Sequence, residues 1–129
     1  VGAALNVHEG PHSISTRYWN TTPLKTRMIV SNEPGYYEDG AFGIRIEHLL
    51  QIVDAPTAHQ FGGETFMTFD VLTLIPIQKK LIDVAKLLPH EVAWIDSYHA
   101  RVWDSISPRL ADDTKTSAWL REATLPLSI

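Results

Sequence analysis

The dipeptide Asp39-Gly40 constrains the fold of this chain more than any other feature of the sequence. Aspartate followed by glycine is favoured in tight hairpin turns, because glycine adopts a positive φ without strain. Met28–Val30 on one side and Gly43–Val53 on the other are rich in β-branched and apolar residues, as strands are. We therefore predict two antiparallel strands, Leu24–Glu33 and Gly43–Val53, folded about Gly40.

This hairpin sets two glutamates opposite each other. With the fold centred on Gly40, the residue opposite Glu33 is Glu47, which lies 14 positions later in the chain. Opposed residues point to the same face of a sheet, with Cβ atoms about 5 Å apart. Two carboxylates that close are unfavourable unless a cation lies between them, and hard divalent cations prefer oxygen ligands. The alternative is an acidic, solvent-facing hairpin whose register is broken by a bulge near Pro34 or Gly43.

Two further residues are candidates for a site on the same face. Arg45 lies two positions before Glu47 on the same strand, so both side chains point to one side. An arginine there can hold a carboxylate ligand in place, although an exposed charge pair is the alternative. His8 precedes the turn at Gly10-Pro11, where a side chain can project into a cleft, although most such histidines are surface residues.

The other polar residues of this region are weaker candidates. His48 faces the opposite side of the strand from Glu47. Glu38 belongs to the expected hairpin tip and is predicted to be solvated. Tyr36 and Tyr37 are expected to pack beside the site, and three more histidines are assigned to loop or helix surfaces: His59, His90 and His99.

Three segments carry a resemblance to a known family. Ser31–His48, SNEPGYYEDGAFGIRIEH, resembles the region that holds the last two metal ligands of aminopeptidase P, the Xaa-Pro aminopeptidases of the pita-bread metallopeptidase family. Leu5–Pro11, LNVHEGP, and Met67–Leu87, MTFDVLTLIPIQKKLIDVAKL, resemble two more family segments, and the last is typical of the larger cytosolic-type enzymes. The three segments lie in family order and span essentially the whole chain.

The resemblance implies a function and roles for the candidate residues. It implies release of the N-terminal residue from peptides with proline at the second position, with two divalent metal ions, usually manganese. Glu33 would bind one metal and handle protons during turnover, Glu47 would bridge both metals, and Arg45 would hold a ligand. His8 would stabilise the charge that develops on the substrate carbonyl. The alternatives are a prolidase-like dipeptidase and a non-catalytic pita-bread binding module.

The resemblance also implies that the chain is the C-terminal part of a longer enzyme. In the family, the point equivalent to Val1 follows a Gly-His-Gly loop, and the upstream half supplies two aspartates and a histidine to the metals. We therefore expect the fragment alone to be inactive, with the metals absent or only partly bound. The missing N-terminal part of the parent, Xaa-Pro peptides and a second copy of the chain are the expected partners.

Length, charge and composition exclude several other classes. A chain of 129 residues suits one compact domain rather than two with separate cores. Its net charge of −4 gives no electrostatic reason to bind nucleic acid or an anionic membrane. No apolar run approaches the roughly 20 residues of a membrane helix. The absence of cysteine fits a reducing compartment, and we expect a cytoplasmic protein.

The hydrophobic pattern predicts an α+β fold, with a mostly antiparallel sheet followed by a helical tail. The resemblance implies that residues 1–78 form the C-terminal part of the pita-bread catalytic domain, and the pattern predicts further strands at Glu64–Phe69 and Val71–Pro76. We expect residues 79–129 to form a helical tail that packs on the sheet or makes a dimer contact, in which three tryptophans take part. Apolar residues at spacings of three and four predict a helix that begins at Pro89 and ends or kinks at Pro108, and Thr114–Ala123 predicts a second helix.

Overall fold

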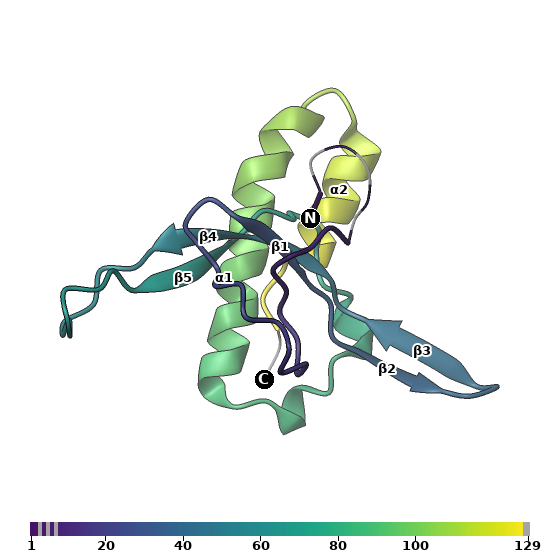
Figure 1. Cartoon of the computed structure of the whole chain (residues 1–129). Helices are drawn as coiled ribbons and strands as arrows, with labels where there is room; N and C mark the ends of the chain where they lie inside the picture. The colour runs from purple at the N-terminus through teal and green to yellow at the C-terminus, as the bar shows by residue number, and fades with distance from the viewer. Residues whose placement is uncertain (3, 5, 7, 128–129) are drawn as a thin grey trace. The chain divides into compact units, whose positions relative to one another are not determined.

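The computed structural model describes residues 1–2, 4, 6 and 8–127. The chain divides into two compact units, Val1–Thr73 and Leu74–Ile129. Among the described residues, the first unit holds the five strands and the second holds the helices, so the order is that of an α+β chain (Figure 1). None of the helices in the described part of the chain is long and apolar enough to cross a membrane.

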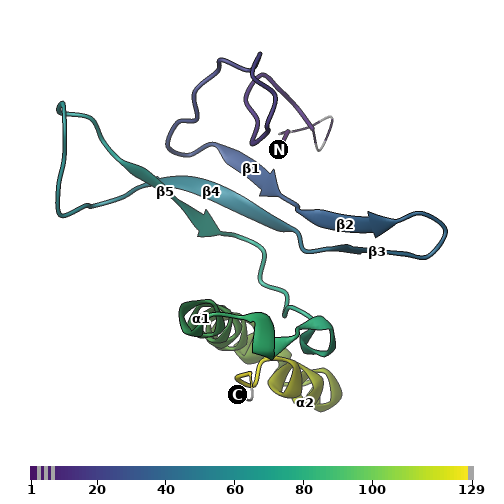
Figure 2. The same cartoon turned by 90° about the horizontal axis from the view of Figure 1, so that it is seen from below.

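Five strands in the first unit form two antiparallel sheets. One sheet has the order β1-β4-β5 and the other pairs β2 with β3. Figure 2 shows β1 leading into β2, and β3 leading back into β4, as one long ribbon. The strands are β1 Ile29–Asn32, β2 Gly35–Glu38, β3 Phe42–Arg45, β4 His48–Asp54 and β5 Met67–Val71.

The predicted hairpin register is present. The numbers of paired residues sum to 80 in the β1–β4 and β2–β3 pairings, as in Ile29 with Gln51 and Gly35 with Arg45. The turn centres on Gly40, which has a φ of 73°. The ribbon is interrupted at Pro34. The Pro34 carbonyl accepts a hydrogen bond from the Ile46 N–H, but proline has no N–H that could donate to the Ile46 carbonyl. One missing ladder bond therefore separates the two sheets without shifting the register.

The core of the first unit lies on one face of the larger sheet. Val30, Leu50 and Ile52 are buried, and three partly buried residues pack against them: Leu24, Met28 and Val71. The first predicted strand was too long. The strand predicted at Leu24–Glu33 begins only at Ile29, because the preceding turn holds Arg27 at a φ of 75°.

The strands predicted at Glu64–Phe69 and Val71–Pro76 are in fact one strand, β5. Its pairing with β4 ends at Val71, opposite Leu50, and a last bond runs from the Leu72 N–H to the Leu49 carbonyl. Beyond that point Ile75 and Ile77 are held by side chains of the first long helix instead of by a strand. The two units accordingly divide after Thr73, whereas the sequence placed the boundary after Gln78.

The second unit is built on helix α1, Pro89–Ile106, as the spacing predicted. Two short 3₁₀ turns precede it, η1 at Lys79–Leu81 and η2 at Val84–Lys86. Pro89 occupies the first helical position, where its missing N–H costs nothing. Val92, Ile95 and Leu127 form the core, with partly buried neighbours from the preceding turns: Ile82, Val84 and Leu87.

The chain after α1 turns back through a 3₁₀ segment, η3 at Ser107–Leu110, into helix α2, Thr114–Ala123. Asp113 caps α2, because its Oδ1 accepts from the Thr116 N–H at 2.9 Å and its Oδ2 from the Thr116 hydroxyl at 2.6 Å. The hydrogen bonds from Thr116 hold the pKa of the Asp113 carboxyl below its usual value. At the other end Lys79 Nζ donates to the carbonyls of Glu122 and Leu125, at 2.8 and 3.1 Å.

Helix α1 also fixes the extended segment that opens the second unit. The Tyr98 hydroxyl donates to the Ile75 carbonyl at 2.6 Å, and the Ile77 N–H donates to Nε2 of His99 at 3.1 Å. His99 is fully buried, with no exposed surface. The assignment of His99 to a helix surface was therefore wrong, because this residue lies on the same face of α1 as Val92, Ile95 and Val102.

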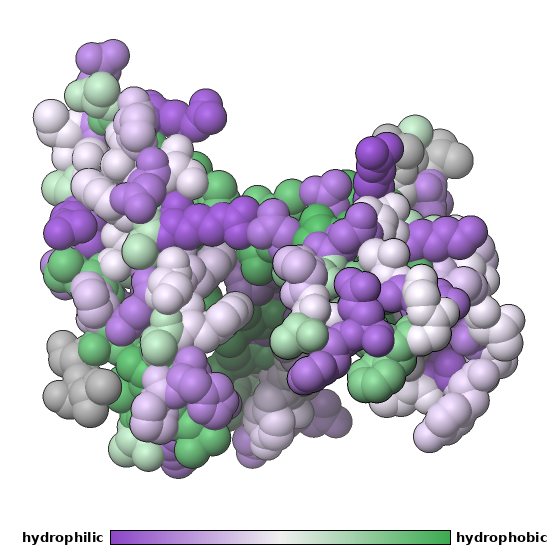
Figure 3. Space-filling model, turned by 90° about the vertical axis from the view of Figure 1, so that its left-hand side faces the viewer, coloured by the Kyte–Doolittle hydropathy of each residue, from purple (hydrophilic) through white to green (hydrophobic). Residues whose placement is uncertain are grey.

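Many large apolar side chains remain exposed in both units. Figure 3 shows apolar and polar side chains side by side on one face of the molecule. Four of the exposed apolar residues on and beside the hairpin β2–β3 share one face, whereas exposed Tyr37 lies on the other: Tyr36, Phe42, Ile44 and Ile46. In the second unit Trp94 and Trp119 are 52% and 59% exposed.

Candidate functional site

The register brings Glu33 and Glu47 opposite each other, as the sequence predicted. Both lie in the short gap between the two sheets, where the paired numbers still sum to 80. The Ile46 N–H bonds to the Pro34 carbonyl, so the pair next to it, 33 with 47, is a non-hydrogen-bonded pair. Side chains approach most closely at such pairs. The bulge that would have separated the two carboxylates is absent at this point of the ribbon.

The Glu33 carboxylate is held at both oxygens. The Ser31 hydroxyl donates to Oε1 at 2.8 Å, and the Arg45 guanidinium forms an ion pair with Oε2. The hydrogen bond from Ser31, followed by the charges of Arg45 and His8, holds the pKa of Glu33 below its usual value. The carboxylate is therefore ionised at neutral pH, which is the state that a metal ligand requires.

Arg45 is fixed by Tyr37 as well as by Glu33. Its Nε donates to the Tyr37 hydroxyl at 2.8 Å, and its guanidinium lies 5.7 Å from the centroid of the Tyr37 ring. The hydrogen bond to Tyr37, followed by the nearby charges of Glu33 and Glu47, raises the pKa of Arg45. Arg45 thus reaches across the hairpin to Glu33, although Glu47 is its neighbour on the same side of its own strand.

Two glycines let Tyr37 lie flat on the hairpin. A Cβ atom placed on Gly43 would come within 2.6 Å of Cδ1 of the Tyr37 ring, and one placed on Gly35 would come within 2.6 Å of its hydroxyl. Both glycines lie on the same face of the hairpin as Tyr37, because Gly35 is two positions before Tyr37 on β2 and Gly43 is paired with Tyr37 on β3. Because glycine has no side chain, the Tyr37 ring has space to lie against the hairpin, and its hydroxyl accepts the hydrogen bond from Arg45.

His8 belongs to the same neighbourhood. An open hollow in the first unit is lined by residues of the loop between His8 and Thr22 and by Val30–Pro34, which include Ser31 and Glu33. The imidazole of His8 is exposed, and a positive charge on it lowers the pKa of Glu33. Glu33 therefore links the candidate residues: it pairs with Arg45, lies opposite Glu47 in the register and feels the charge of His8.

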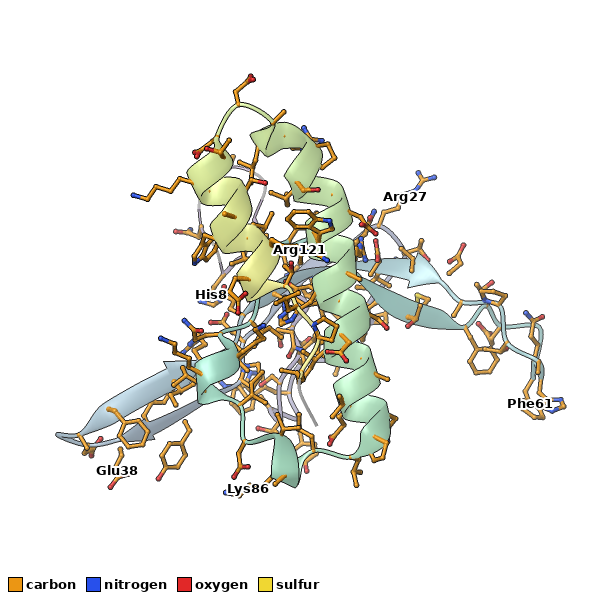
Figure 4. The ribbon with its side chains drawn as sticks, turned by 180° about the vertical axis from the view of Figure 1, so that it is seen from behind. His8, Arg27, Glu38, Phe61, Lys86 and Arg121 are labelled. Carbon is orange, nitrogen blue, oxygen red and sulfur yellow. The ribbon has the colours of Figure 1, made fainter. Side chains whose placement is uncertain are left out.

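The weaker candidates lie elsewhere. Figure 4 shows Glu38 at the free end of the hairpin β2–β3. His48 is buried on the core side of β4, and burial lowers its pKa. His59 and His90 are exposed. Ser31 was missed by the sequence reasoning, although its position two residues before Glu33 on one strand was a usable signal.

The donor set fits a hard divalent cation but does not complete a site. Two carboxylates on directly opposed positions offer the oxygen ligands that manganese prefers. In the part of the chain that the structure describes, no group of three or more histidine, aspartate or glutamate residues is arranged to hold a metal ion. A dinuclear centre would therefore need further ligands besides Glu33 and Glu47.

Comparison with known proteins places these residues in a family. Residues 1–54 match the model of metallopeptidase family M24, and residues 65–127 match the model of the C-terminal region of peptidase M24. The chain is 60% identical over 128 residues to aminopeptidase P2 of Arabidopsis thaliana, covering 99% of this chain and 18% of that protein. It is 50% identical to a probable Xaa-Pro aminopeptidase P of Laccaria bicolor, covering 98% of this chain and 20% of that protein.

A solved structure agrees with the fold. The X-prolyl aminopeptidase of Caenorhabditis elegans, described as a cytosolic enzyme with a di-nuclear active site, superposes with a TM-score of 0.82 at 36% identity, over 95% of this chain and 20% of that one. The expected portion of a pita-bread fold is thereby confirmed. The chain spans about a fifth of the length of the curated relatives that it matches. With nearly all of its residues matched by the two models, the chain belongs to metallopeptidase family M24.

Proposed function

We propose that the polypeptide containing this chain is a metal-dependent Xaa-Pro aminopeptidase, which removes the N-terminal residue from peptides with proline at the second position. The observation that carries this proposal is the opposed pair Glu33 and Glu47, beside a hollow that also receives His8. The identity of the chain to aminopeptidases P of plants and fungi supports the same activity.

Glu33 and Glu47 would hold two divalent ions, and manganese is the metal we propose for these oxygen donors. When bound, such ions polarise the carbonyl to be cleaved and lower the pKa of a water molecule. The resemblance to aminopeptidase P implies that Glu47 would contact both ions and Glu33 one. The remaining ligands would come from another part of the longer polypeptide.

The neighbouring side chains orient the reactants. Arg45 holds the Glu33 carboxylate and is itself fixed by Tyr37, so the ligand keeps one orientation. Glu33 also handles protons during turnover. His8 would donate a hydrogen bond to the oxygen of the substrate carbonyl, where negative charge develops as water adds to the carbonyl carbon, before the bond to proline breaks.

A substrate comparison tests the proposal. The complete natural polypeptide that contains this chain is loaded with Mn²⁺ and given a tripeptide with proline second, the Xaa-Pro dipeptide, and a tripeptide without proline. Release of the N-terminal residue from the first peptide alone supports the proposal. Cleavage of the dipeptide alone indicates a prolidase-like dipeptidase, and binding of peptides without cleavage indicates a non-catalytic module.

We also propose that the protein is cytosolic and forms a homodimer through its helical tail. Trp94 and Trp119 are both more than half exposed in the second unit, and large exposed aromatic residues are enriched at protein interfaces. Trp94 also stacks on Tyr98 within the unit, with ring centroids 6.0 Å apart, and the Arg121 guanidinium lies 5.0 Å from the ring of Trp103. Sedimentation analysis of the wild type and of Trp94→Ala tests the contact, and a monomeric wild type contradicts it.

A further inference from the structure

The hydroxyl of Ser31 contacts the candidate metal ligand Glu33, and the proposed function gives this contact no role. This residue lies on β1, two positions before Glu33, so both side chains point to the same face of the strand. Val30, the residue before Ser31, belongs to the hydrophobic core, and the side of the strand that carries Ser31 and Glu33 lines the hollow. The hydroxyl is therefore placed at the candidate site and not in the hydrophobic core.

We propose that Ser31 is a positioning residue that fixes the Glu33 carboxylate for metal binding. This inference rests on the proposed function, because it assigns Ser31 a part in the same metal site. Ser31 touches neither substrate nor metal in this assignment. It acts only through the carboxylate.

Two donors on different residues hold the Glu33 carboxylate. Ser31 Oγ donates to Oε1 of Glu33 at 2.8 Å, while Arg45 pairs with Oε2, so the carboxyl group is held from both sides. Rotation of the carboxyl group would break both contacts at once. A carboxylate oxygen has two acceptor positions, so one remains on each oxygen for a metal ion. The two donors thus orient the carboxylate and still leave acceptor positions on both oxygens for a metal ion.

The two donors are not equivalent electrostatically. Arg45 brings a positive charge, which repels a cation as well as holding the ligand. Ser31 supplies a neutral hydrogen bond, which orients the carboxylate without opposing the metal. Removal of such an outer contact from a metal ligand commonly weakens metal binding by about 10- to 100-fold.

An isosteric pair of variants isolates the hydroxyl. Ser31→Thr keeps it, Ser31→Val replaces it with a methyl group of the same shape, and both β-branched residues suit a strand. Ser13→Ala is the matched control, because the Ser13 hydroxyl lines the same hollow but accepts from Asn20 at 2.7 Å and makes no contact with Glu33. All variants are made in the complete natural polypeptide that contains this chain.

Mn²⁺ affinity, measured by titration calorimetry, is the readout, and the melting temperature of the metal-free protein reports folding. We expect Ser31→Val to bind Mn²⁺ about 10-fold more weakly or worse. Ser31→Thr and Ser13→Ala should stay within about threefold of the wild type, with all melting temperatures alike. Equal affinities for the Thr and Val variants, or equal losses in both, would overturn the assignment.

The same experiment separates this inference from the proposed function. A wild type that binds Mn²⁺ but does not cleave Xaa-Pro peptides refutes the function, while the comparison of the Thr and Val variants still decides the role of Ser31. A wild type that binds no Mn²⁺ overturns both. An active enzyme whose Val variant binds Mn²⁺ as tightly as its Thr variant overturns the role of Ser31 alone.

Discussion

Protonation of His99 is expected to release the segment Leu74–Gln78 from helix α1. Nε2 of His99 accepts a hydrogen bond from the Ile77 N–H, so this nitrogen carries no proton. Nδ1 is buried without a hydrogen-bond partner among the described residues. A second proton would therefore abolish the bond to Ile77 and place a charge in a fully buried ring.

The sign of the pH dependence follows from the pKa. Burial, followed by the nearby charge of Lys79, lowers the pKa of His99 in the folded unit, and the charge of Asp96 opposes this only in part. The folded unit thus binds the proton more weakly than the unfolded chain. The stabilisation is complete above the unfolded pKa of about 6.5 and is lost as the pH falls below it, by at most about 1.4 kcal/mol per pH unit.

Hydrogen exchange followed by mass spectrometry measures this locally in the complete natural polypeptide. Peptides that cover Leu74–Gln78 are compared at pH 7.5, 6.5 and 5.5, after correction for the intrinsic exchange rate. We expect protection to fall by up to about tenfold per pH unit below 6.5. His99→Gln, which keeps an acceptor but does not titrate, should remove this dependence.

His90→Gln is the matched control, because His90 lies exposed in the first turn of the same helix. It should leave the pH dependence as in the wild type. If wild-type protection stays constant from pH 7.5 to 5.5, or if the His90 variant also removes the dependence, the reasoning about the buried imidazole is wrong.

Four shorter predictions concern the site and the helices. Glu47→Ala should abolish cleavage of Xaa-Pro peptides by removing an opposed carboxylate, while Glu38→Ala at the hairpin tip should leave the rate unchanged; equal rates for the two variants would contradict the site. His8→Ala should still bind Mn²⁺ but lose about 10²- to 10³-fold in kcat, and an unchanged kcat rules out its role at the carbonyl. Asp113→Ala should cost about 1 kcal/mol of stability in urea unfolding, and Asp112→Ala less than about 0.5 kcal/mol, because only Asp113 caps α2. The isolated 129-residue chain should self-associate through its exposed apolar strands, and light scattering that shows a stable monomer would refute this.

Local signals in the sequence determined several elements of the fold. Asp39-Gly40 fixed the register, because a turn with glycine at a positive φ leaves one way to pair the flanking strands. That register alone placed Glu33 opposite Glu47. Helix α2 was predicted with the same bounds, Thr114–Ala123, as the structure has. Each of these features depends on neighbours in sequence, which is why one chain suffices to predict them.

Other features depend on contacts between distant residues, and only the tertiary structure decided them. The length of β5 is set by its pairing with β4, so the apolar run that continues to Pro76 could not reveal where the strand ends. His99 looked like a surface residue because histidine is often exposed, yet it is buried where Ile77 needs an acceptor.

The candidate site likewise has features that local sequence determines and features that depend on tertiary contacts. The sequence by itself determined which residues face the hollow side of the hairpin, since alternation along a strand is a local property. It did not determine that Arg45 pairs with Glu33 across the hairpin, nor that Tyr37 lies over two glycines to hold it. These contacts depend on which long side chains have space on that face of the hairpin. The space is set by how all the side chains pack, which only the tertiary structure shows.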